Sequence, residues 1–205
     1  MKKLTVILLA VFMVIGMSTA ASAAPTLSFN IDFYGGDTTY LQGDFDLGET
    51  IILQPGDSVK VDILFSVTEE AVVGGGFDLA FNPSNLAASS LMLTAPFLDF
   101  GLSEITSGHV RAQGGVWPAG NFLGPGENIG IASFTFECLG ASLDELWLYD
   151  FDTVTSEWVT ETGACLDGQI DGIYLASISN VPIPGAVWLL GSGLIGLVGL
   201  RRRRS

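Results

Sequence analysis

Hydrophobic and polar residues alternate in several short stretches of the chain. Ser58–Val67 (SVKVDILFSV) has valine, isoleucine or phenylalanine at every second position, with Lys60 and Asp62 among the residues between them. A period of two predicts a half-buried β-strand, because successive side chains of a strand point to opposite faces. The same pattern predicts further strands at Thr26–Phe33, Gly76–Asn82, Ile129–Cys138, Leu143–Tyr149 and Gln169–Leu175.

Turn signals separate these stretches. Pro and Gly in Gln54–Asp57 (QPGD) and Pro in Asn82–Asn85 (NPSN) predict tight turns. Glycine-rich breaks are expected at 74–76, 114–115 and 124–128, and Leu86–Leu93 is expected to give at most one short helical turn. Short alternating strands with no amphipathic helix of useful length predict an all-β fold, a sandwich or barrel around one core.

The N-terminus differs from this pattern. Two lysines precede an apolar run that reaches Met17, and Ala21-Ser22-Ala23 follows. This order is typical of a secretory signal peptide over residues 1–23, with cleavage after Ala23 directed by Ala21 and Ala23. The alternative is an uncleaved membrane anchor, which the small-residue site disfavours.

The C-terminus contains a second apolar segment. Ala186–Leu200 carries no charge, and a helix over it would be about 22 Å long, or about 30 Å counted from Val181. Arg201, Arg202, Arg203 and Arg204 would then stop the helix at the cytoplasmic side of the membrane. A buried soluble helix is the alternative, but four consecutive arginines are unusual at the end of one.

Residues 181–205 resemble a PEP-CTERM sorting signal. The resemblance rests on Val181, Pro182, Ile183 and Pro184, then Trp188, the Gly-Ser-Gly at 191–193 and the arginine cluster, with Pro-Ile-Pro in place of Pro-Glu-Pro. It implies that exosortase, a membrane-embedded cysteine protease, cuts near the proline motif. It also implies export through the inner membrane of a Gram-negative bacterium, with transient anchoring by the C-terminal helix and a final place at the cell surface or in the extracellular matrix.

The segment 24–180 is then one secreted domain, and it is strongly acidic. It contains all 22 acidic residues of the chain against two basic ones, Lys60 and Arg111, a formal net charge of −20. Nucleic-acid binding is excluded in practice, because neutralising phosphates needs cationic side chains. The remaining explanations are a solvated acidic surface, Ca²⁺ binding, a cationic partner or neutral sugars.

Two cysteines, Cys138 and Cys165, fall in the secreted segment. An even number in an oxidising compartment favours a disulfide, which would close a loop of about 28 residues and contribute about 3–4 kcal/mol. The alternative, a catalytic thiol, needs a basic partner, and His109 is the single histidine.

Residues 50–175 are similar to cohesin domains. Pro55–Val61 (PGDSVKV) before an alternating strand, Gly75–Leu86 (GGFDLAFNPSNL) and the glycine-rich turn into the strand at Gly124–Phe136 carry the similarity. It implies a jelly-roll-like β-sandwich of the kind shared with several carbohydrate-binding modules. No motif position identifies a partner-binding residue.

Enzyme signatures are absent from the sequence, including Gly-x-Ser-x-Gly, His-Glu-x-x-His and glycine-rich phosphate loops. Asp144, Asp150 and Asp152 lie close in sequence and are weak candidates for Ca²⁺, although their spacing matches no EF-hand loop. We therefore expect no resident cofactor, with Ca²⁺ as the one exception to test.

Three tryptophans, Trp117, Trp147 and Trp158, are candidates to stack on sugar rings, with packing in the core as the alternative. We expect an exported, non-enzymatic envelope or matrix protein with an adhesive or structural role linked to extracellular polysaccharide. Its partners would be exosortase, polysaccharide or another envelope protein. The alternatives are a carbohydrate-binding module, a cohesin-like protein–protein interaction module and, last, a secreted hydrolase.

Overall fold

The computed structural model describes residues 23–35, 48–116, 122–140, 142–152 and 154–179. Within these ranges almost all regular structure is β. The strands are β1 (Leu27–Gly35), β2 (Thr50–Ile52), β3 (Ser58–Val67), β4 (Gly74–Ala80), β5 (Leu86–Leu93), β6 (Phe97–Asp99), β7 (Glu104–Thr106), β8 (His109–Val116), β9 (Gly126–Cys138), β10 (Leu143–Tyr149) and β11 (Ile173–Ser179). One 3₁₀ turn, η1 (Asp167–Gln169), precedes β11.

The first sheet has four strands in the order β1-β3-β9-β5, and all neighbours are antiparallel. One of its two inner strands, β3, has the predicted bounds, and the valine, isoleucine and phenylalanine side chains of β3 are buried while Lys60 is exposed. The alternation in the sequence therefore corresponds to side chains of β3 that point in turn into the core and toward the surface.

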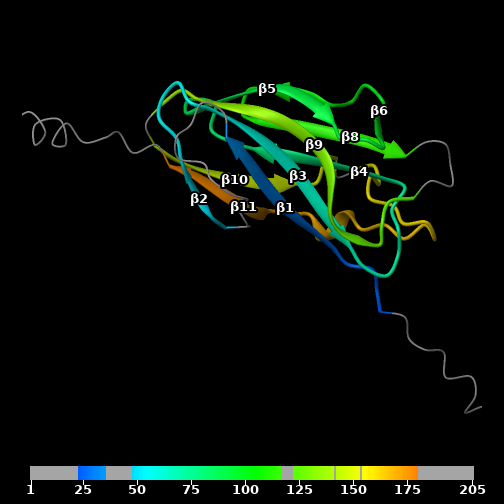
Figure 1. The fold of residues 1–205 in the computed structure, drawn as a ribbon. Coiled ribbons are helices and arrows are strands. Elements are labelled where there is room, and N and C mark those ends of the chain that lie inside the picture. Colours follow the sequence, from blue (N-terminus) through cyan, green and yellow to red (C-terminus); the bar gives the residue numbers. More distant parts are fainter. Residues whose placement is uncertain (1–22, 36–47, 117–121, 141, 153, 180–205) are drawn as a thin grey trace, which may run out of the picture.

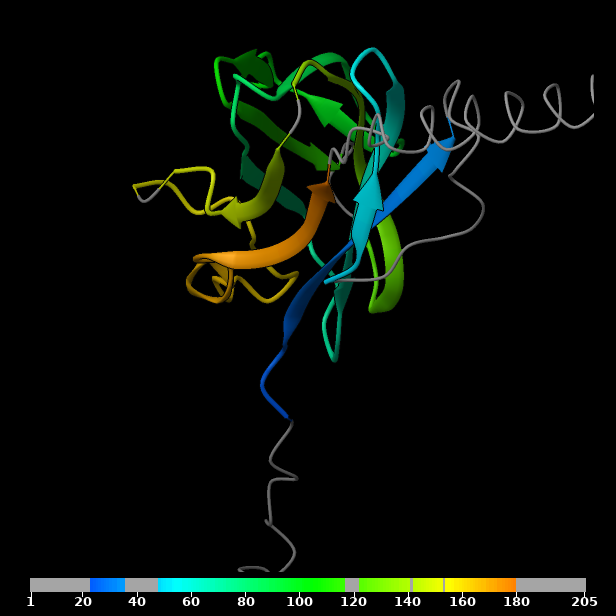
Figure 2. The same ribbon diagram turned by 90° about the vertical axis from the view of Figure 1, so that its left-hand side faces the viewer.

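The second sheet has seven strands. Six follow the order β2-β11-β10-β4-β8-β6, and β7 pairs with β8 beside that path. β2 runs parallel to β11, and the other neighbours are antiparallel. The two sheets pack against each other around one hydrophobic core (Figures 1 and 2), so the prediction of a β-sandwich is confirmed.

Glycines expected to break the chain lie inside strands instead. Gly75 of β4 pairs with Gly114 of β8. A Cβ on Gly75 would lie 2.7 Å from the Trp158 ring, and one on Gly114 would lie 2.6 Å from the Leu93 side chain. The predicted breaks at 74–76 and 114–115 are wrong, because these glycines make room for bulky side chains that cover the strands.

The two proline-containing turns are confirmed. The backbone N–H of Asp57 donates to the carbonyl of Gln54 at 2.9 Å, and Gly56 between them has φ of 94°. The N–H of Asn85 donates to the carbonyl of Asn82 at 3.0 Å. Both turns therefore follow from local residue chemistry.

Two other elements differ from the prediction. Leu86–Leu93 is not a helical turn but strand β5, because its backbone pairs along β9. The last strand covers Ile173–Ser179 rather than Gln169–Leu175, since η1 occupies the start of the predicted range. Pairing with a neighbouring strand decided the first case, and a local turn decided the second.

The predicted disulfide is wrong: Cys138 and Cys165 are both free thiols. Cys165 forms an isolated β-bridge with Val159. The neighbouring residue Trp158 packs its ring on Phe65. Phe65 is opposite Ile129 on β9, whereas Cys138 ends that strand nine residues later. Nine residues of extended strand span roughly 30 Å at about 3.3 Å per residue, whereas a disulfide needs Cα atoms within about 7 Å.

The predicted terminal signals fall largely outside the described residues. This holds for Ala21, the proline motif at 181–184, the apolar segment after it and Arg201–Arg204. Ala23 is the first described residue and is exposed. Within the described ranges no helix is long and apolar enough to span a bilayer.

Candidate functional site

Neighbouring strands of the large sheet, with β10, β4 and β8 at the centre, present an unusual set of outward side chains. Register places Trp147 of β10 opposite Ala80 of β4, and Ala80 opposite His109 of β8. The next row joins Tyr149, Asp78 and Arg111. We call this surface the Trp147 face; it consists of Asp78, Glu104, His109, Arg111, Glu145, Trp147, Tyr149 and Tyr174.

Aromatic rings form one half of the Trp147 face. The ring centroids of Trp147 and Tyr174 are 5.4 Å apart, and the indole N–H of Trp147 donates to Glu145 at 3.1 Å. Tyr149, two residues further along β10, is 38% exposed. These contacts hold the Trp147 ring in one orientation while part of it remains open to solvent.

Charged groups form the other half. Asp78 lies 2.8 Å from His109 Nδ1 and 3.6 Å from Arg111 Nε. Arg111 also contacts Glu104 at 3.2 Å and donates to the carbonyl of Phe151 at 2.7 Å. Its guanidinium lies 4.4 Å from the centre of the Phe151 ring. The arginine is thus fixed by several partners rather than free to move.

The three tryptophan candidates have different places. Trp147 is half-buried on the Trp147 face, and Trp117 lies outside the described residues. Trp158 is fully buried; its indole N–H donates to the carbonyl of Gly76 at 2.6 Å, and its ring packs edge-on to Phe29 and Phe65. Trp158 as a sugar platform is therefore a wrong prediction, because no face of its ring reaches solvent.

The three aspartates predicted as Ca²⁺ candidates do not come together. Asp144 is the second residue of β10 and Asp150 follows its end, so they are about 20 Å apart at about 3.3 Å per residue. The Asp144 carboxylate accepts from the Asn82 N–H at 3.1 Å, and burial raises the pKa of Asp144. Asp152 accepts from the Val154 N–H at 2.8 Å. The grouping is wrong because a shared strand face brings together only residues that are close along the strand.

Asp150 instead meets two acidic residues that the sequence did not single out. One carboxylate oxygen each from Asp150, Glu157 and Asp167 lie within 4.8 Å of one another, and we call these three the acidic cluster. Burial, and then the neighbouring negative charges, raise the pKa of Asp150 and of Glu157. Glu157 and Asp167 are buried, whereas Asp150 is half-buried.

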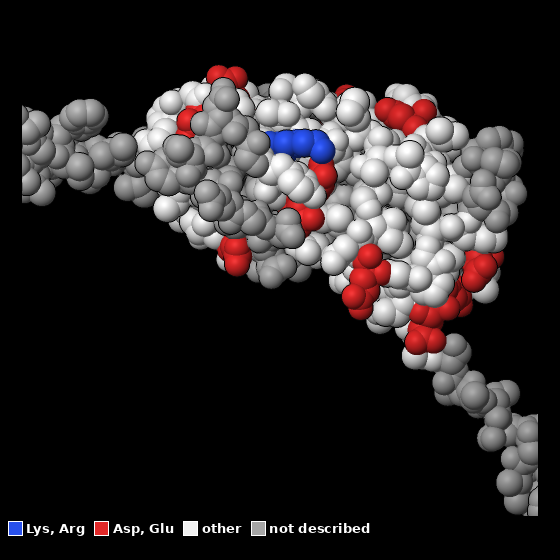
Figure 3. All heavy atoms as spheres, in the orientation of Figure 1, with Lys and Arg blue, Asp and Glu red and all other residues white. Residues whose placement is uncertain are grey.

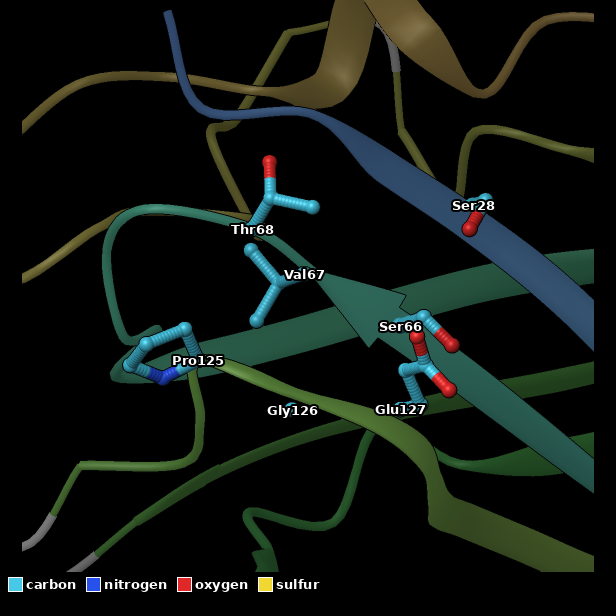
Figure 4. Close-up of a pocket in the computed structure, with 7 residues that line it drawn as sticks. All are labelled: Ser28, Ser66, Val67, Thr68, Pro125, Gly126 and Glu127. Carbon is cyan, nitrogen blue, oxygen red and sulfur yellow. The ribbon is translucent and has the colours of Figure 1, made fainter. Parts of the chain in front are cut away.

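A hollow of about 480 Å³ opens at the other sheet (Figure 4), between β1, the end of β3 and the start of β9. Its lining consists of Ser28, Ser66, Val67, Thr68, Pro125, Gly126 and Glu127. None of these seven carries an aromatic ring, so the hollow offers no stacking surface. On the face of the molecule shown in Figure 3, acidic side chains lie in several separate places while basic ones are scarce.

Part of the site could have been read from the sequence. The alternation of β10 already places Glu145, Trp147 and Tyr149 on one face. Asp78 and Arg111 carry no such signal, since they meet only through the pairing of β4 with β8. The same holds for the acidic cluster, whose members come from a connection between strands rather than from one motif.

No protein-family model matches the chain, and no curated protein matches it in sequence. The fold is similar to the sixth cohesin of scaffoldin B from Acetivibrio cellulolyticus, solved in complex with a Cel5 dockerin mutant, with TM-score 0.50, 12% identity and coverage of 75% of this chain and 99% of that one. CaCohA2 from Clostridium acetobutylicum gives TM-score 0.49, 13% identity and coverage of 76% and 91%. A cohesin module from a family 33 glycoside hydrolase of Clostridium perfringens gives TM-score 0.48 and 12% identity, with coverage of 76% of this chain and 100% of that one. The resemblance to cohesins is thus confirmed for the fold.

Proposed function

We propose that this protein is an exported, non-enzymatic interaction module, and that the Trp147 face is its docking surface for a protein partner. The observation that carries this proposal is the side-chain chemistry of that face. Tryptophan, tyrosine and arginine dominate the binding energy of many protein interfaces. Here Trp147 and Tyr149 of β10 and Arg111 of β8 lie on one face of the same sheet, with β4 between the two strands.

Restraint of these side chains supports the proposal. Trp147 is held by Glu145 and Tyr174, and Arg111 is held by Asp78, Glu104 and Phe151. A side chain that is already ordered loses little conformational entropy when a partner binds. The face is therefore organised for recognition before any partner arrives.

The fold supports the same reading. The neighbour from Acetivibrio cellulolyticus is a cohesin in complex with a dockerin, so this architecture can present a protein-binding surface. Fold alone does not determine function, and the argument for this chain therefore depends on the Trp147 face.

Charge defines the kind of partner. The segment 24–180 carries 22 acidic side chains against two basic ones. A field of that sign repels acidic proteins and speeds the approach of basic ones. We propose a partner with a basic surface, located at the envelope or in the extracellular matrix.

The terminal segments supply the proposed route. A signal peptide over 1–23 would start export, and exosortase would cut near Val181–Pro184 while the C-terminal helix holds the protein in the inner membrane. Intact mass measured with and without exosortase tests this route. Loss of the segment beyond about Val181 only when exosortase is present is the expected result, and full-length protein in both hosts would contradict it.

Polysaccharide binding is the second candidate, and one observation favours it. Trp147, Tyr149 and Tyr174 together form an aromatic surface that is partly open to solvent. A flat π surface matches the apolar face of a sugar ring. The same surface would then bind the extracellular polysaccharide directly.

The test compares two variants of the full-length chain, Trp147→Ala and Phe100→Ala. Phe100 is 63% exposed and contacts Gly115, six residues along β8 from His109, so it is an aromatic control outside the Trp147 face. Envelope fractions of the host are passed over each immobilised protein. We expect one basic protein to be retained by the wild type and by Phe100→Ala, and at least about tenfold less of it by Trp147→Ala.

Two outcomes would contradict protein docking. Equal retention by all three proteins would place the partner elsewhere on the molecule. Retention on polysaccharide gels that Trp147→Ala abolishes, with no protein captured, would establish the sugar-binding candidate instead.

A further inference from the structure

We propose that the acidic cluster of Asp150, Glu157 and Asp167 is a Ca²⁺ site that fastens the connection between β10 and β11 to the sandwich. This inference is independent of the Trp147 face and of what docks there. It differs from the grouping of Asp144, Asp150 and Asp152 that the sequence suggested, because two of its three members come from outside that group.

The dimensions of the cluster fit the ion. Ca²⁺ binds oxygen ligands at about 2.3–2.6 Å, so two oxygens on opposite sides of one ion are about 5 Å apart. The three carboxylate oxygens lie within 4.8 Å of one another. They can therefore share one ion without rearrangement of the backbone.

Orphaned oxygens point to a missing ligand. Glu157 is only 5% exposed, yet its Oε2 has no hydrogen-bond partner, and the buried Oδ1 of Asp150 has none either. The other oxygen of Glu157 accepts from Thr155 and, at 3.4 Å, from Gln113. A buried carboxylate oxygen without a donor costs free energy, and a bound cation removes that cost.

Further oxygen ligands lie next to the cluster. Gln113 reaches Glu157 through its Nε2, and its own Oε1 is buried without a partner. Asp167 accepts from the Trp158 N–H at 2.8 Å and from the Cys165 thiol at 3.1 Å, and each oxygen keeps a second lone pair. Three carboxylates, one amide oxygen and water together supply the six to eight oxygens that Ca²⁺ prefers.

Electrostatics require a counter-charge here. The three carboxylates are mutually repulsive, and Lys60 and Arg111 are the two basic residues of the segment 24–180. Arg111 is engaged with Asp78, Glu104 and Phe151, and Lys60 is paired with Asp62 at 3.1 Å. A divalent cation from solution is thus the natural neutralising group.

The position of the site gives the ion a structural role. Asp150 follows β10, Glu157 precedes the buried Trp158, and Asp167 begins η1 before β11. One ion would tie three points of this connection together beside the core. Oxygen ligands and flexible geometry favour Ca²⁺ over Mg²⁺, which demands a small octahedral site.

The experiment titrates the full-length chain, first stripped with EDTA, with Ca²⁺, Mg²⁺ and Tb³⁺. Trp158 lies beside the cluster, so excitation of tryptophan should sensitise Tb³⁺ emission, which Ca²⁺ but not Mg²⁺ displaces. We compare the wild type with Asp150→Asn and with the control Asp171→Asn. Asp171 is exposed, lies outside the cluster and loses the same charge.

The difference in melting temperature between Asp150→Asn and the wild type should change sign when Ca²⁺ replaces EDTA. In EDTA, Asp150→Asn should melt at a higher temperature than the wild type, because one repulsive charge is gone. In Ca²⁺ the wild type should melt higher, and the affinity of Asp150→Asn should be at least about tenfold weaker. Asp171→Asn should behave as the wild type in both conditions.

Three results would overturn the site. Absence of Tb³⁺ emission, Ca²⁺ heat and a Ca²⁺-dependent melting shift in the wild type would do so, whether or not the variants fold. An unchanged affinity in Asp150→Asn would also do so. Equal loss in Asp150→Asn and Asp171→Asn would show general attraction of cations to an acidic surface.

Discussion

Two tryptophans eleven residues apart have opposite environments. Trp147 lies on the outer face of the large sheet, half-buried, with its indole N–H on the carboxylate of Glu145. Trp158 is fully buried, with its indole N–H on the backbone of Gly76 and its ring against Phe29 and Phe65 of the other sheet. Residue type alone does not distinguish these two roles.

The difference teaches where stability and recognition reside in this molecule. Trp158 contacts both sheets, so the burial of its ring stabilises the folded state. Trp147 contacts its own sheet and keeps part of its ring open, so it can still gain free energy from a partner. Each substitution below tests whether the two regions can be separated in this way.

The largest effect is expected from Trp158→Ala. Removal of a fully buried indole leaves a cavity between the sheets and an unpaired carbonyl on Gly76, and we expect a loss of about 3–5 kcal/mol in the free energy of unfolding. Urea denaturation measures it. Trp147→Ala should cost only about 1 kcal/mol, since one aromatic contact and one exposed hydrogen bond are lost. Similar losses in the free energy of unfolding from both variants would contradict this separation of stability from recognition.

A smaller effect is expected from Gly75→Ala. The new Cβ would lie 2.7 Å from the Trp158 ring, and overpacking of this kind costs about 1–3 kcal/mol. Gly168→Ala is the matched control, because a Cβ there meets nothing within 4 Å. Melting temperatures compare the two variants, and equal values would show that the Trp158 ring moves freely over β4.

The smallest effect concerns Asp144, three residues before Trp147. Burial raises the pKa of its carboxyl above the ordinary value of 3.8, so the folded state takes up its proton more readily than the unfolded state. Its contribution to stability is therefore full below pH 3.8 and is lost as the pH rises through the raised pKa. Asp144→Asn keeps an oxygen for the Asn82 N–H and should lose less stability between pH 4 and 7 than the wild type. Identical pH profiles by thermal denaturation would contradict this.

The strands with the clearest period-two alternation are the ones whose bounds the sequence predicts best. β3 and β10 have the bounds that the sequence predicts, because a half-buried strand must place apolar residues at every second position. The proline-glycine turn at Gln54–Asp57 was equally local. The same alternation along β10 placed Trp147 and Tyr149 of the Trp147 face on one side of the sheet, whereas Tyr174 joins them only through the pairing of β10 with β11.

The sequence by itself thus determined the alternating strands, the proline turns and the acidity of the domain. Tertiary structure alone decided which tryptophan is buried, that Gly75 and Gly114 lie within strands, and that the two cysteines are far apart. It also brought Asp150, Glu157 and Asp167 together. The physical reason is that alternation and turns act over a few residues, whereas these features depend on contacts between segments that are distant along the chain.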